Sequence, residues 1–194
     1  MDEIISGLNG RPRLLLHACC APCATHSLEC VMPFFDVTLF YYNPNTYPYE
    51  EYLKRLDTLK KLSDITNIPI TEGEYDDRTF YAAARGLEQL PEGGLRCAQC
   101  FRLRLERTAF TAKKLGYDMF ATTLTVSPHK NAQLINTIGL EMQGSSGITY
   151  LPSDFKKRDG FKRSAELSAE YGLYRQNYCG CEFSLNNIEN NKGV

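Results

Sequence analysis

Short strand-like runs alternate with longer helical patterns along most of this chain, and this alternation restricts its fold more than any other feature. Apolar, β-branched or aromatic residues concentrate in five runs, at 13–18, 36–42, 68–71, 117–124 and 148–151. Helical periodicity, proline starts and glycine stops mark six intervening segments, at 22–31, 49–66, 80–84, 97–115, 127–144 and 161–171. Strands that alternate with helices form parallel sheets covered on both faces. The sequence therefore predicts a three-layer α/β/α fold with a five-stranded parallel sheet.

The length of 194 residues fits a single α/β domain, which we expect to cover residues 1–185. Residues 186–194 are polar and rich in asparagine, and we expect a mobile tail there. The chain opens with an acidic Met1-Asp2-Glu3, and its apolar run at 14–16 is too short for a signal core or a membrane span. These features predict a cytoplasmic protein without membrane association.

Seven of the eight cysteines fall into three tight groups. Thiols stay reduced in the cytosol, so clustered cysteines in such a protein more often bind metal or perform redox chemistry than form structural disulfides. The eighth, Cys30, stands alone on the first predicted helix, where we expect a buried apolar role. The groups are Cys19-Cys20-x-x-Cys23, Cys97-x-x-Cys100 and Cys179-Gly180-Cys181.

The first two groups together offer four soft ligands. Cys97 and Cys100 are three residues apart near a helix start, so their sulfurs lie on one face. Cys19 and Cys20 directly follow the first strand, at the sheet edge where ligands bind in parallel α/β folds. Four thiolates suit a tetrahedral metal or a [4Fe–4S] cluster. A structural zinc site is the alternative, although two adjacent cysteines chelate zinc awkwardly.

The third group, Cys179-Gly180-Cys181, has several interpretations. A disulfide across one residue closes a small, strained ring, which suits a labile redox pair. The two thiols can equally ligate a second metal, or be unrelated thiols beside a glycine. The role of Cys23 stays open, since it can serve either site or support the loop.

A set of motifs in a fixed order gives the chain a resemblance to a known family. The similarity extends over residues 13–183 and is to the QueH family, the cobalamin-independent epoxyqueuosine reductases. The motifs that carry it are His17-Ala18-Cys19-Cys20-Ala21-Pro22-Cys23, Tyr42-Asn43-Pro44-Asn45, Arg96-Cys97-Ala98-Gln99-Cys100, Gly160-Phe161-Lys162-Arg163-Ser164 and Tyr174-Arg175-Gln176-Asn177-Tyr178-Cys179-Gly180-Cys181.

The resemblance implies a function and a cofactor. It implies reduction of the epoxide of epoxyqueuosine in tRNA, the last step of queuosine synthesis, on a fold similar to the adenine nucleotide α-hydrolase-like (HUP) group. It also implies a redox-active pair at Cys179 and Cys181, together with a [4Fe–4S] cluster whose ligands we carry over to Cys19, Cys20, Cys97 and Cys100.

A second iron, held by cysteine and aspartate, is a further implication of the resemblance. The thiol candidates are Cys23 and the Cys179/Cys181 pair. The carboxylate candidates are Asp154 and Asp159, which flank a basic segment. His17, Tyr178 or bound water are the candidate proton donors, and the electron donor is an unidentified one-electron or dithiol reductant.

The net charge of −1 does not exclude an RNA partner, because two local runs are basic. Residues 96–107 hold four arginines and one glutamate, and residues 153–163 hold five basic residues and two aspartates. The alternative is that these runs are ordinary solvated faces. The segment 129–131 either holds a phosphate or the ribose, or caps a helix. Candidate substrate contacts are Tyr42, Asn43, Lys162, Arg163 and Arg175.

Two other functions remain open from the sequence. One is a thiol–disulfide or electron-transfer protein that uses Cys179 and Cys181 without a tRNA substrate. The other is a zinc-stabilised tRNA-binding module that has no catalytic activity.

Overall fold

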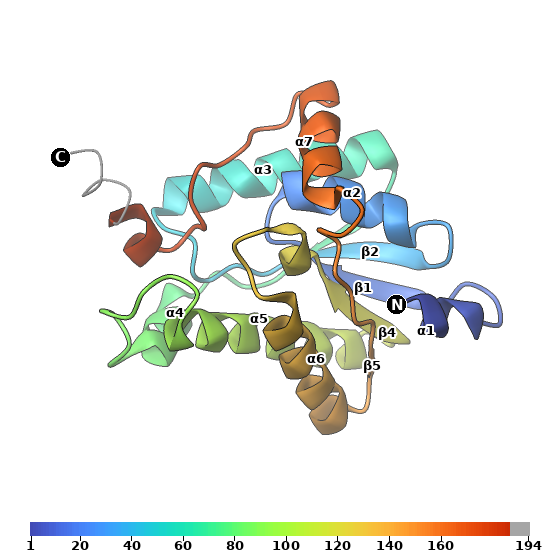
Figure 1. Cartoon of the computed structure of the whole chain (residues 1–194), viewed down its shortest axis with the longest axis horizontal. Coiled ribbons are helices and arrows are strands. Elements are labelled where there is room, and N and C mark those ends of the chain that lie inside the picture. Colours follow the sequence, from blue (N-terminus) through green and yellow to red (C-terminus); the bar gives the residue numbers. More distant parts are fainter. Residues whose placement is uncertain (187–194) are drawn as a thin grey trace.

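The computed structural model describes residues 1–186 and contains one five-stranded parallel sheet with strand order β3-β2-β1-β4-β5. Four of these strands, β2, β1, β4 and β5, are labelled in Figure 1. Every predicted strand is confirmed, with ends within two residues of the predicted ones. The predicted tail lies outside the described residues, apart from residue 186. The strands are β1 (Arg13–His17), β2 (Asp36–Tyr41), β3 (Ile70–Glu72), β4 (Met119–Thr122) and β5 (Thr149–Tyr150).

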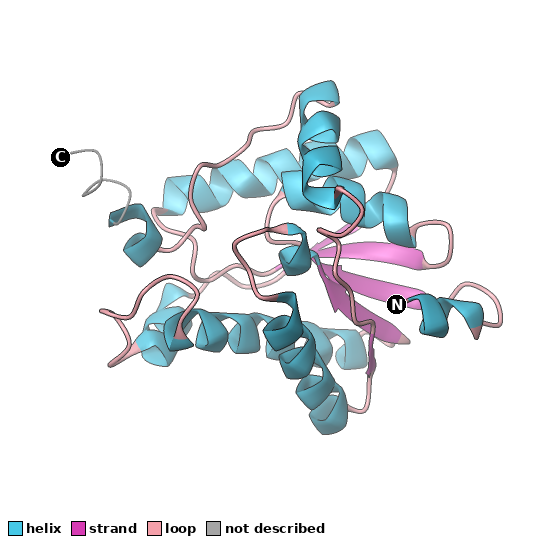
Figure 2. Cartoon of the chain, in the orientation of Figure 1, coloured by secondary structure: helices cyan, strands magenta, loops and turns pink. Residues whose placement is uncertain are grey.

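Helices cover both faces of this sheet, which confirms the predicted three-layer architecture (Figure 2). One face carries α2 (Ala21–Val31), α3 (Tyr49–Thr66) and α7 (Gly160–Glu170). The other face carries α5 (Leu95–Lys114) and α6 (Ala132–Ser146), with α4 (Asp77–Ala84) packed against α5. None of the described helices is long and apolar enough to cross a bilayer.

The alternation of side chains along β1 divides the core into two apolar layers. Leu14 and Leu16 are buried against α2 and α3, whereas Leu15 is buried against α5 and α6. Successive residues of a strand point to opposite faces, and a sheet covered on both sides buries both sets. The uninterrupted leucine run is therefore the signature of a central parallel strand.

The prediction for the helix at 127–144 is wrong at both ends. The side chain of Asn131 accepts a hydrogen bond from the backbone N–H of Leu134, so α6 begins only after this cap. A short 3₁₀ helix, η1 (Thr123–Val126), precedes it instead. The helix continues past Gly144 and ends at Gly147, whose φ of 78° gives the left-handed C-terminal cap. The short helix α1 (Asp2–Ser6) and the helical turn at 182–186 were not predicted.

The strand order places a topological switch point beside β1. β1 pairs with β2 on one side and with β4 on the other, and the chain crosses over in opposite directions from this point. A crevice forms at the carboxyl ends of the strands where such a switch occurs. His17 and Thr122 are the last paired residues of β1 and β4, so the segments that follow them border this crevice.

Candidate metal and substrate site

Three cysteine sulfurs lie together where β1 passes into α2. Cys19 and Cys20 occupy the connection and Cys23 the first turn of the helix. The three Sγ atoms lie within 4.8 Å of one another, and those of Cys19 and Cys20 are 3.7 Å apart. Cys20 is the N-cap of α2, with extended backbone and Pro22 in the first turn, so the turn of the chain brings the thiols together.

Electrostatics favour one thiolate in this group of three. The pKa of Cys19 is well below the usual value, because the thiols of Cys20 and Cys23 donate to its sulfur and the cations Lys130 and Arg104 are near. The same contact raises the pKa of Cys20 to about 11. The group is therefore poised to bind a cation through a first thiolate, and binding would release the remaining protons.

Contacts from distant segments fix these thiols in place. The backbone N–H of Cys19 donates to Oγ1 of Thr123 over 3.2 Å, across the switch point. The side-chain amide of Gln176 donates to Sγ of Cys20 over 2.9 Å. Hydrogen bonds to ligand sulfurs orient them and tune a bound metal. Thr123 and Gln176 are thus supporting residues for these thiols. No sequence pattern identified Thr123, whereas Gln176 lies in one of the family motifs without a role assigned to it.

The second cysteine pair lies at the start of α5, as predicted, although this helix begins at Leu95. Sγ of Cys97 accepts a hydrogen bond from the backbone N–H of Gly93 over 3.2 Å. Sγ of Cys100 lies 3.9 Å from Nη1 of Arg104, one turn along the helix. Burial raises the pKa of Cys100. This pair is therefore a shielded thiol site with one cation beside it.

Arg104 lies between the two cysteine groups. It is buried, and its guanidinium donates to Oδ1 of Asn43 over 2.6 Å and approaches Nε2 of His17 at 3.4 Å. Burial lowers its pKa, but the nearby sulfurs of Cys100 and Cys19 raise it further, so it stays charged. A fixed positive charge at this point would offset the negative charge of thiolates if they held a metal centre.

A cavity of about 600 Å³ opens over the first cysteine group. Its walls come from the start of α2, from α3, from the loop before α6, from the start of α7 and from the C-terminal segment 175–184. Basic, aromatic and thiol groups share this space, which suits an anionic, planar ligand. The lining residues that matter below are Cys19, Cys23, Cys179, Lys130, Phe161 and Arg175.

The third cysteine group is divided between two environments. Cys179 lines the cavity. Cys181 is buried in an apolar cluster with Cys100 and Phe80, and burial together with Cys179 raises its pKa to about 12. All eight cysteines are free thiols in the structure. Cys179 also influences the pKa of Cys97 and of Cys100, so the third group approaches the second.

Two further cations lie in the cavity wall, and of these the sequence patterns missed Arg55. Arg55, buried on α3, lines the cavity, although its position within the helix gives no motif signal. Lys130 was predicted to bind phosphate or to be part of a helix cap. Asn131 provides that cap, while the charges of Cys179 and Cys19 raise the pKa of Lys130 more than burial lowers it.

Two predicted substrate contacts, Tyr42 and Asn43, lie in the protein interior. The Tyr42 ring lies 5.2 Å below the guanidinium of Arg107. Asn43 donates to the backbone carbonyl of Ala18 over 3.0 Å, which braces the loop carrying Cys19. Both side chains contact protein groups and do not line the cavity, so substrate contact at these two positions stays a prediction.

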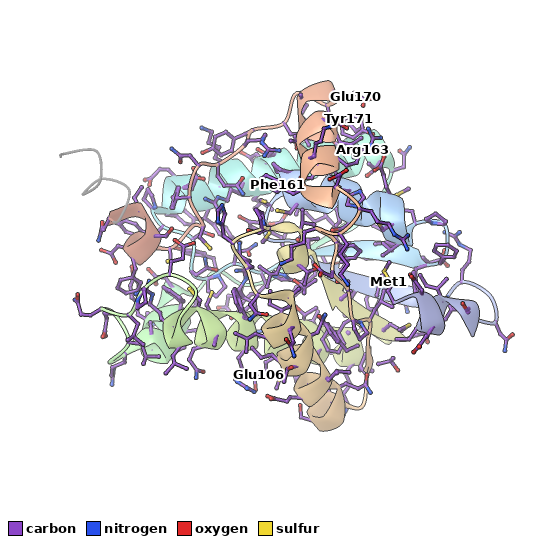
Figure 3. The ribbon with its side chains drawn as sticks, viewed as in Figure 1. Met1, Glu106, Phe161, Arg163, Glu170 and Tyr171 are labelled. Carbon is purple, nitrogen blue, oxygen red and sulfur yellow. The ribbon has the colours of Figure 1, made fainter. Side chains whose placement is uncertain are left out.

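The predicted contacts on and after α7 have different surroundings. Arg163 makes two hydrogen bonds, of 2.6 and 3.1 Å, to the carboxylate of Glu29 on α2, and Lys162 is exposed. Figure 3 shows Phe161 and Arg163 on different sides of α7. Phe161 and Arg175 line the cavity, with the Arg175 guanidinium 5.8 Å from the Phe161 ring. Arg175 is thus the predicted basic contact that reaches the cavity.

The interpretation of residues 96–107 as a basic surface run is wrong. Arg96 and Arg104 are buried, and Arg102 forms an ion pair with Glu141 on α6. Arg96 instead donates to the carbonyls of Glu88 and Leu90, both over 2.6 Å. A charge count along the sequence cannot separate helix faces, and this helix turns two of its four arginines inward.

The carboxylate candidates for a second metal do not lie among the cysteines. Among the described residues, the compact group of metal-binding side chains contains thiols alone, and neither Asp154 nor Asp159 lines the cavity. Glu92 is the acidic residue that does, and it accepts a hydrogen bond from Ser184 over 3.1 Å. The assignment of Asp154 and Asp159 stays a prediction. The sequence signal for Glu92 is its position five residues before Cys97.

The two side chains considered as proton donors differ in their access to the cavity. His17 is fully buried between Thr122 and the carbonyl of Tyr42, and burial followed by the charge of Arg104 lowers its pKa to about 3. It is therefore a neutral, hydrogen-bonded residue at the end of β1. Tyr178 lines the cavity, and burial raises its pKa to about 12, so its hydroxyl stays protonated at neutral pH.

Cys30 is half-buried, with its sulfur 3.5 Å from Nε2 of His26, and partly fits the predicted apolar role.

The donor set around the cavity fits an iron–sulfur group. Sulfur donors from two separate segments, low solvent access and hydrogen bonds to the sulfurs are the features that such clusters require. The buried guanidinium of Arg104 and the ammonium of Lys130 compensate thiolate charge. Among the described residues, the fit does not extend to a second iron with a carboxylate ligand.

Comparison with known proteins places this chain among enzymes of one name. A family model described as "Epoxyqueuosine reductase QueH" matches residues 14–187. The protein of that name from Staphylococcus epidermidis is 44% identical over 182 residues, covering 90% of this chain and 76% of its own length. The Streptococcus pyogenes protein is 44% identical, covering 90% and 71%, and the Thermotoga maritima protein is 39% identical, covering 89% and 90%.

Solved structures support the fold class. A predicted subunit of tRNA methyltransferase from Methanocaldococcus jannaschii superposes with a TM-score of 0.56 at 14% identity, covering 93% of this chain and 88% of its own. The U34-tRNA thiolase NcsA from Methanococcus maripaludis, solved with its [4Fe–4S] cluster, has a TM-score of 0.56 at 13% identity, covering 96% and 69%. These similarities confirm the predicted α/β fold class. By the extent of the family match and the identity to its members, the chain belongs to the epoxyqueuosine reductase QueH family.

Proposed function

We propose that this protein is an epoxyqueuosine reductase that removes the epoxide oxygen of epoxyqueuosine in tRNA, the last step of queuosine formation. Family membership supports the reaction. The observation that carries it is the cavity of about 600 Å³ that combines thiols with cations at the switch point of the sheet. A modified nucleoside bound in such a cavity would have its reacting ring near sulfur.

The reaction needs two electrons and two protons. One C–O bond of the epoxide breaks at each carbon, an alkene forms, and the oxygen leaves as water. A bound [4Fe–4S] cluster supplies electrons singly, at a potential that the protein tunes. Two thiols, at Cys179 and Cys181, supply two electrons and two protons when they form a disulfide. An external one-electron or dithiol donor then restores the reduced state.

For the cluster we assign Cys19, Cys20, Cys97 and Cys100 as ligands. The first two lie at the switch point and the last two begin a helix on the opposite face of the sheet. A second iron with Cys23 and an aspartate, Asp154 or Asp159, stays an implication of the resemblance. Cys23 lines the cavity together with Cys19.

The cavity wall provides contacts for an anticodon loop. We assign phosphate contact to Arg175 in the cavity wall and to the exposed Lys162 outside it, and base stacking to Phe161, which is 42% exposed. Proteins recognise unstacked RNA bases by stacking them on aromatic side chains and hold phosphates with basic ones. Lys130 adds a cation deeper in the cavity. Free thiols in this number persist in a reducing compartment, so we assign the protein to the cytoplasm.

The direct test is incubation of the anaerobically purified, reduced protein with tRNA that carries epoxyqueuosine. After digestion, mass spectrometry should find a nucleoside that has lost one oxygen atom. Nucleoside of unchanged mass, with protein that holds its full iron content, contradicts the proposal. A colourless, zinc-loaded protein that binds the tRNA would favour the zinc-stabilised binding module instead.

A further inference from the structure

The Cys179-Gly180-Cys181 segment is held to α3 by a single buried arginine. Arg55 is 2% exposed, and its guanidinium donates to the backbone carbonyls of Cys179 and Tyr178 over 3.1 and 3.3 Å. It also lies 5.0 Å from the centre of the Tyr178 ring. The segment has no regular structure of its own before residue 182, so these contacts determine where Cys179 lies.

A carboxylate on α3 extends this contact to Tyr174, five residues before Cys179. Glu51, one helical turn before Arg55, accepts its Nε–H over 2.8 Å. Glu51 also accepts the hydroxyl proton of Tyr174, with distances of 3.0 and 3.2 Å to its two oxygens. Burying a charged pair is costly unless its hydrogen bonds are satisfied. Here Glu51 binds Tyr174 and Arg55 binds Cys179, so the pair fixes both ends of residues 174–179.

Gly180 shows how closely the segment approaches the arginine. Its φ is 126°, and a Cβ built at this position would lie 2.7 Å from Nη1 of Arg55 and 3.5 Å from Nδ2 of Asn45. Its carbonyl accepts the backbone N–H of Tyr47 over 2.7 Å. The residue between the two cysteines is therefore restricted to glycine by both conformation and space.

We infer that Arg55 is a positioning residue, which holds the Cys179 thiol at the cavity while Cys181 stays in the apolar cluster with Cys100. This role rests on the proposed function, in which the two thiols act as a redox pair. The backbone carbonyls are fixed from α3, and Ser184 accepts the N–H of Cys179 from the other side over 3.3 Å. Cys179 thus has a defined position without contributing to the sheet.

Arg55→Lys tests the role because lysine keeps the charge but loses the planar fork that reaches two carbonyls. In the anaerobically purified protein, we expect iodoacetamide labelling of Cys179 relative to Cys30 to rise about tenfold, the factor for losing one charge-assisted hydrogen bond. With epoxyqueuosine-tRNA, kcat should fall about 10- to 100-fold without a matching rise in KM. Arg78→Lys, at an exposed ion pair with Asp76, is the matched control and should change neither quantity.

Tyr174→Phe provides a second, milder variant, since it removes only the hydroxyl bound to Glu51. It should change the labelling ratio in the same direction by a smaller factor, and it tests the role if Arg55→Lys does not fold. Folded variants with the wild-type labelling ratio and wild-type kcat would overturn the inference. Failure of the wild-type protein to reduce the nucleoside would reject the proposed function alone, because the labelling ratio is measured without tRNA.

Discussion

Gln176 and Cys20 are 156 positions apart in the chain, yet the side-chain amide of one donates to the sulfur of the other over 2.9 Å. The contact joins the C-terminal segment to the loop after β1. The amide oxygen of Gln176 is buried and has no hydrogen-bond partner among residues 1–186. The side chain of Gln176 thus bonds to Cys20 while its own buried oxygen stays unpaired, which costs free energy of folding. An unpaired buried polar atom of this kind is typical of a functional site.

Replacing Gln176 with leucine should remove the hydrogen bond that orients Cys20. We expect reductase activity to fall about 10- to 100-fold, the usual cost of losing a contact to a metal ligand. Steady-state kinetics and iron analysis of the purified protein check this. Gln133→Leu, at an exposed position on α6, is the control. Equal activity in both variants would show that the contact is incidental.

The Cys100→Ala variant should lose iron and sulfide together with activity. Cys100 is buried beside Arg104, so its removal leaves a guanidinium without the sulfur that it faces. Iron and sulfide assays and the visible absorption of anaerobic protein measure the effect. Cys30→Ala, on the outer part of α2, should keep both. Retention of full cluster content by Cys100→Ala would refute the ligand assignment.

Phe161→Ala should weaken tRNA binding through the loss of a stacking surface. Base–aromatic stacking contributes about 1–3 kcal/mol per base, so we expect KM for tRNA to rise roughly 5- to 150-fold with a smaller change in kcat. Phe161→Trp should restore binding. The comparison variant is Phe110→Ala, an exposed phenylalanine on α5 that does not line the cavity. If the Phe161→Ala and Phe110→Ala variants have the same KM, the ring at 161 has no contact with RNA.

Acid should destabilise the protein through His17. Its pKa is about 3 in the folded chain because of burial and the charge of Arg104, whereas an imidazole in an unfolded chain has a pKa of about 6.5. Below pH 6.5 the unfolded state binds a proton that the folded state does not bind. The free energy of unfolding therefore falls as the pH decreases towards 3. The expected slope is about 1.4 kcal/mol per pH unit.

Urea denaturation at several pH values between 7 and 4 measures this slope. The difference between wild type and His17→Asn isolates the histidine from the carboxylates that titrate in the same range. The variant is less stable at pH 7, since it loses contacts to Thr122 and Tyr42. Its stability should depend less on pH, and a parallel dependence in both proteins would show that His17 is not the titrating group.

The fold was accessible from the sequence because its signals are local. The leucine run of β1, the periodicity of α3 and the glycine stops each act within a few residues, and the elements formed close to their predicted positions. The start of α6 was misplaced because Asn131 and the preceding Ser127-Pro128 both give start signals, and the true cap lies at Asn131. Helix ends compete in this way wherever two capping residues lie close together.

The residues of the candidate site could be predicted only in part from the sequence. The cysteine motifs indicated which thiols matter, because their spacing is visible in the chain. Arg55 and Thr123 carry no such pattern, and each contacts the site across more than a hundred residues. The basic run at 96–107 was misleading for a related reason, since Arg104 points inward on a helix whose orientation depends on the packing of the whole sheet.

Part of the cavity wall comes from the last quarter of the chain. The sheet has its last strand at Tyr150, yet Phe161, Arg175 and Cys179 all come after it. Segments with few apolar contacts open locally at a lower free energy than a sheet does. Mild heating or protease should therefore detach residues 174–181 first and leave a folded remnant that keeps its secondary structure but has lost reductase activity. Inactivation of this protein should then precede its global unfolding as a separate event.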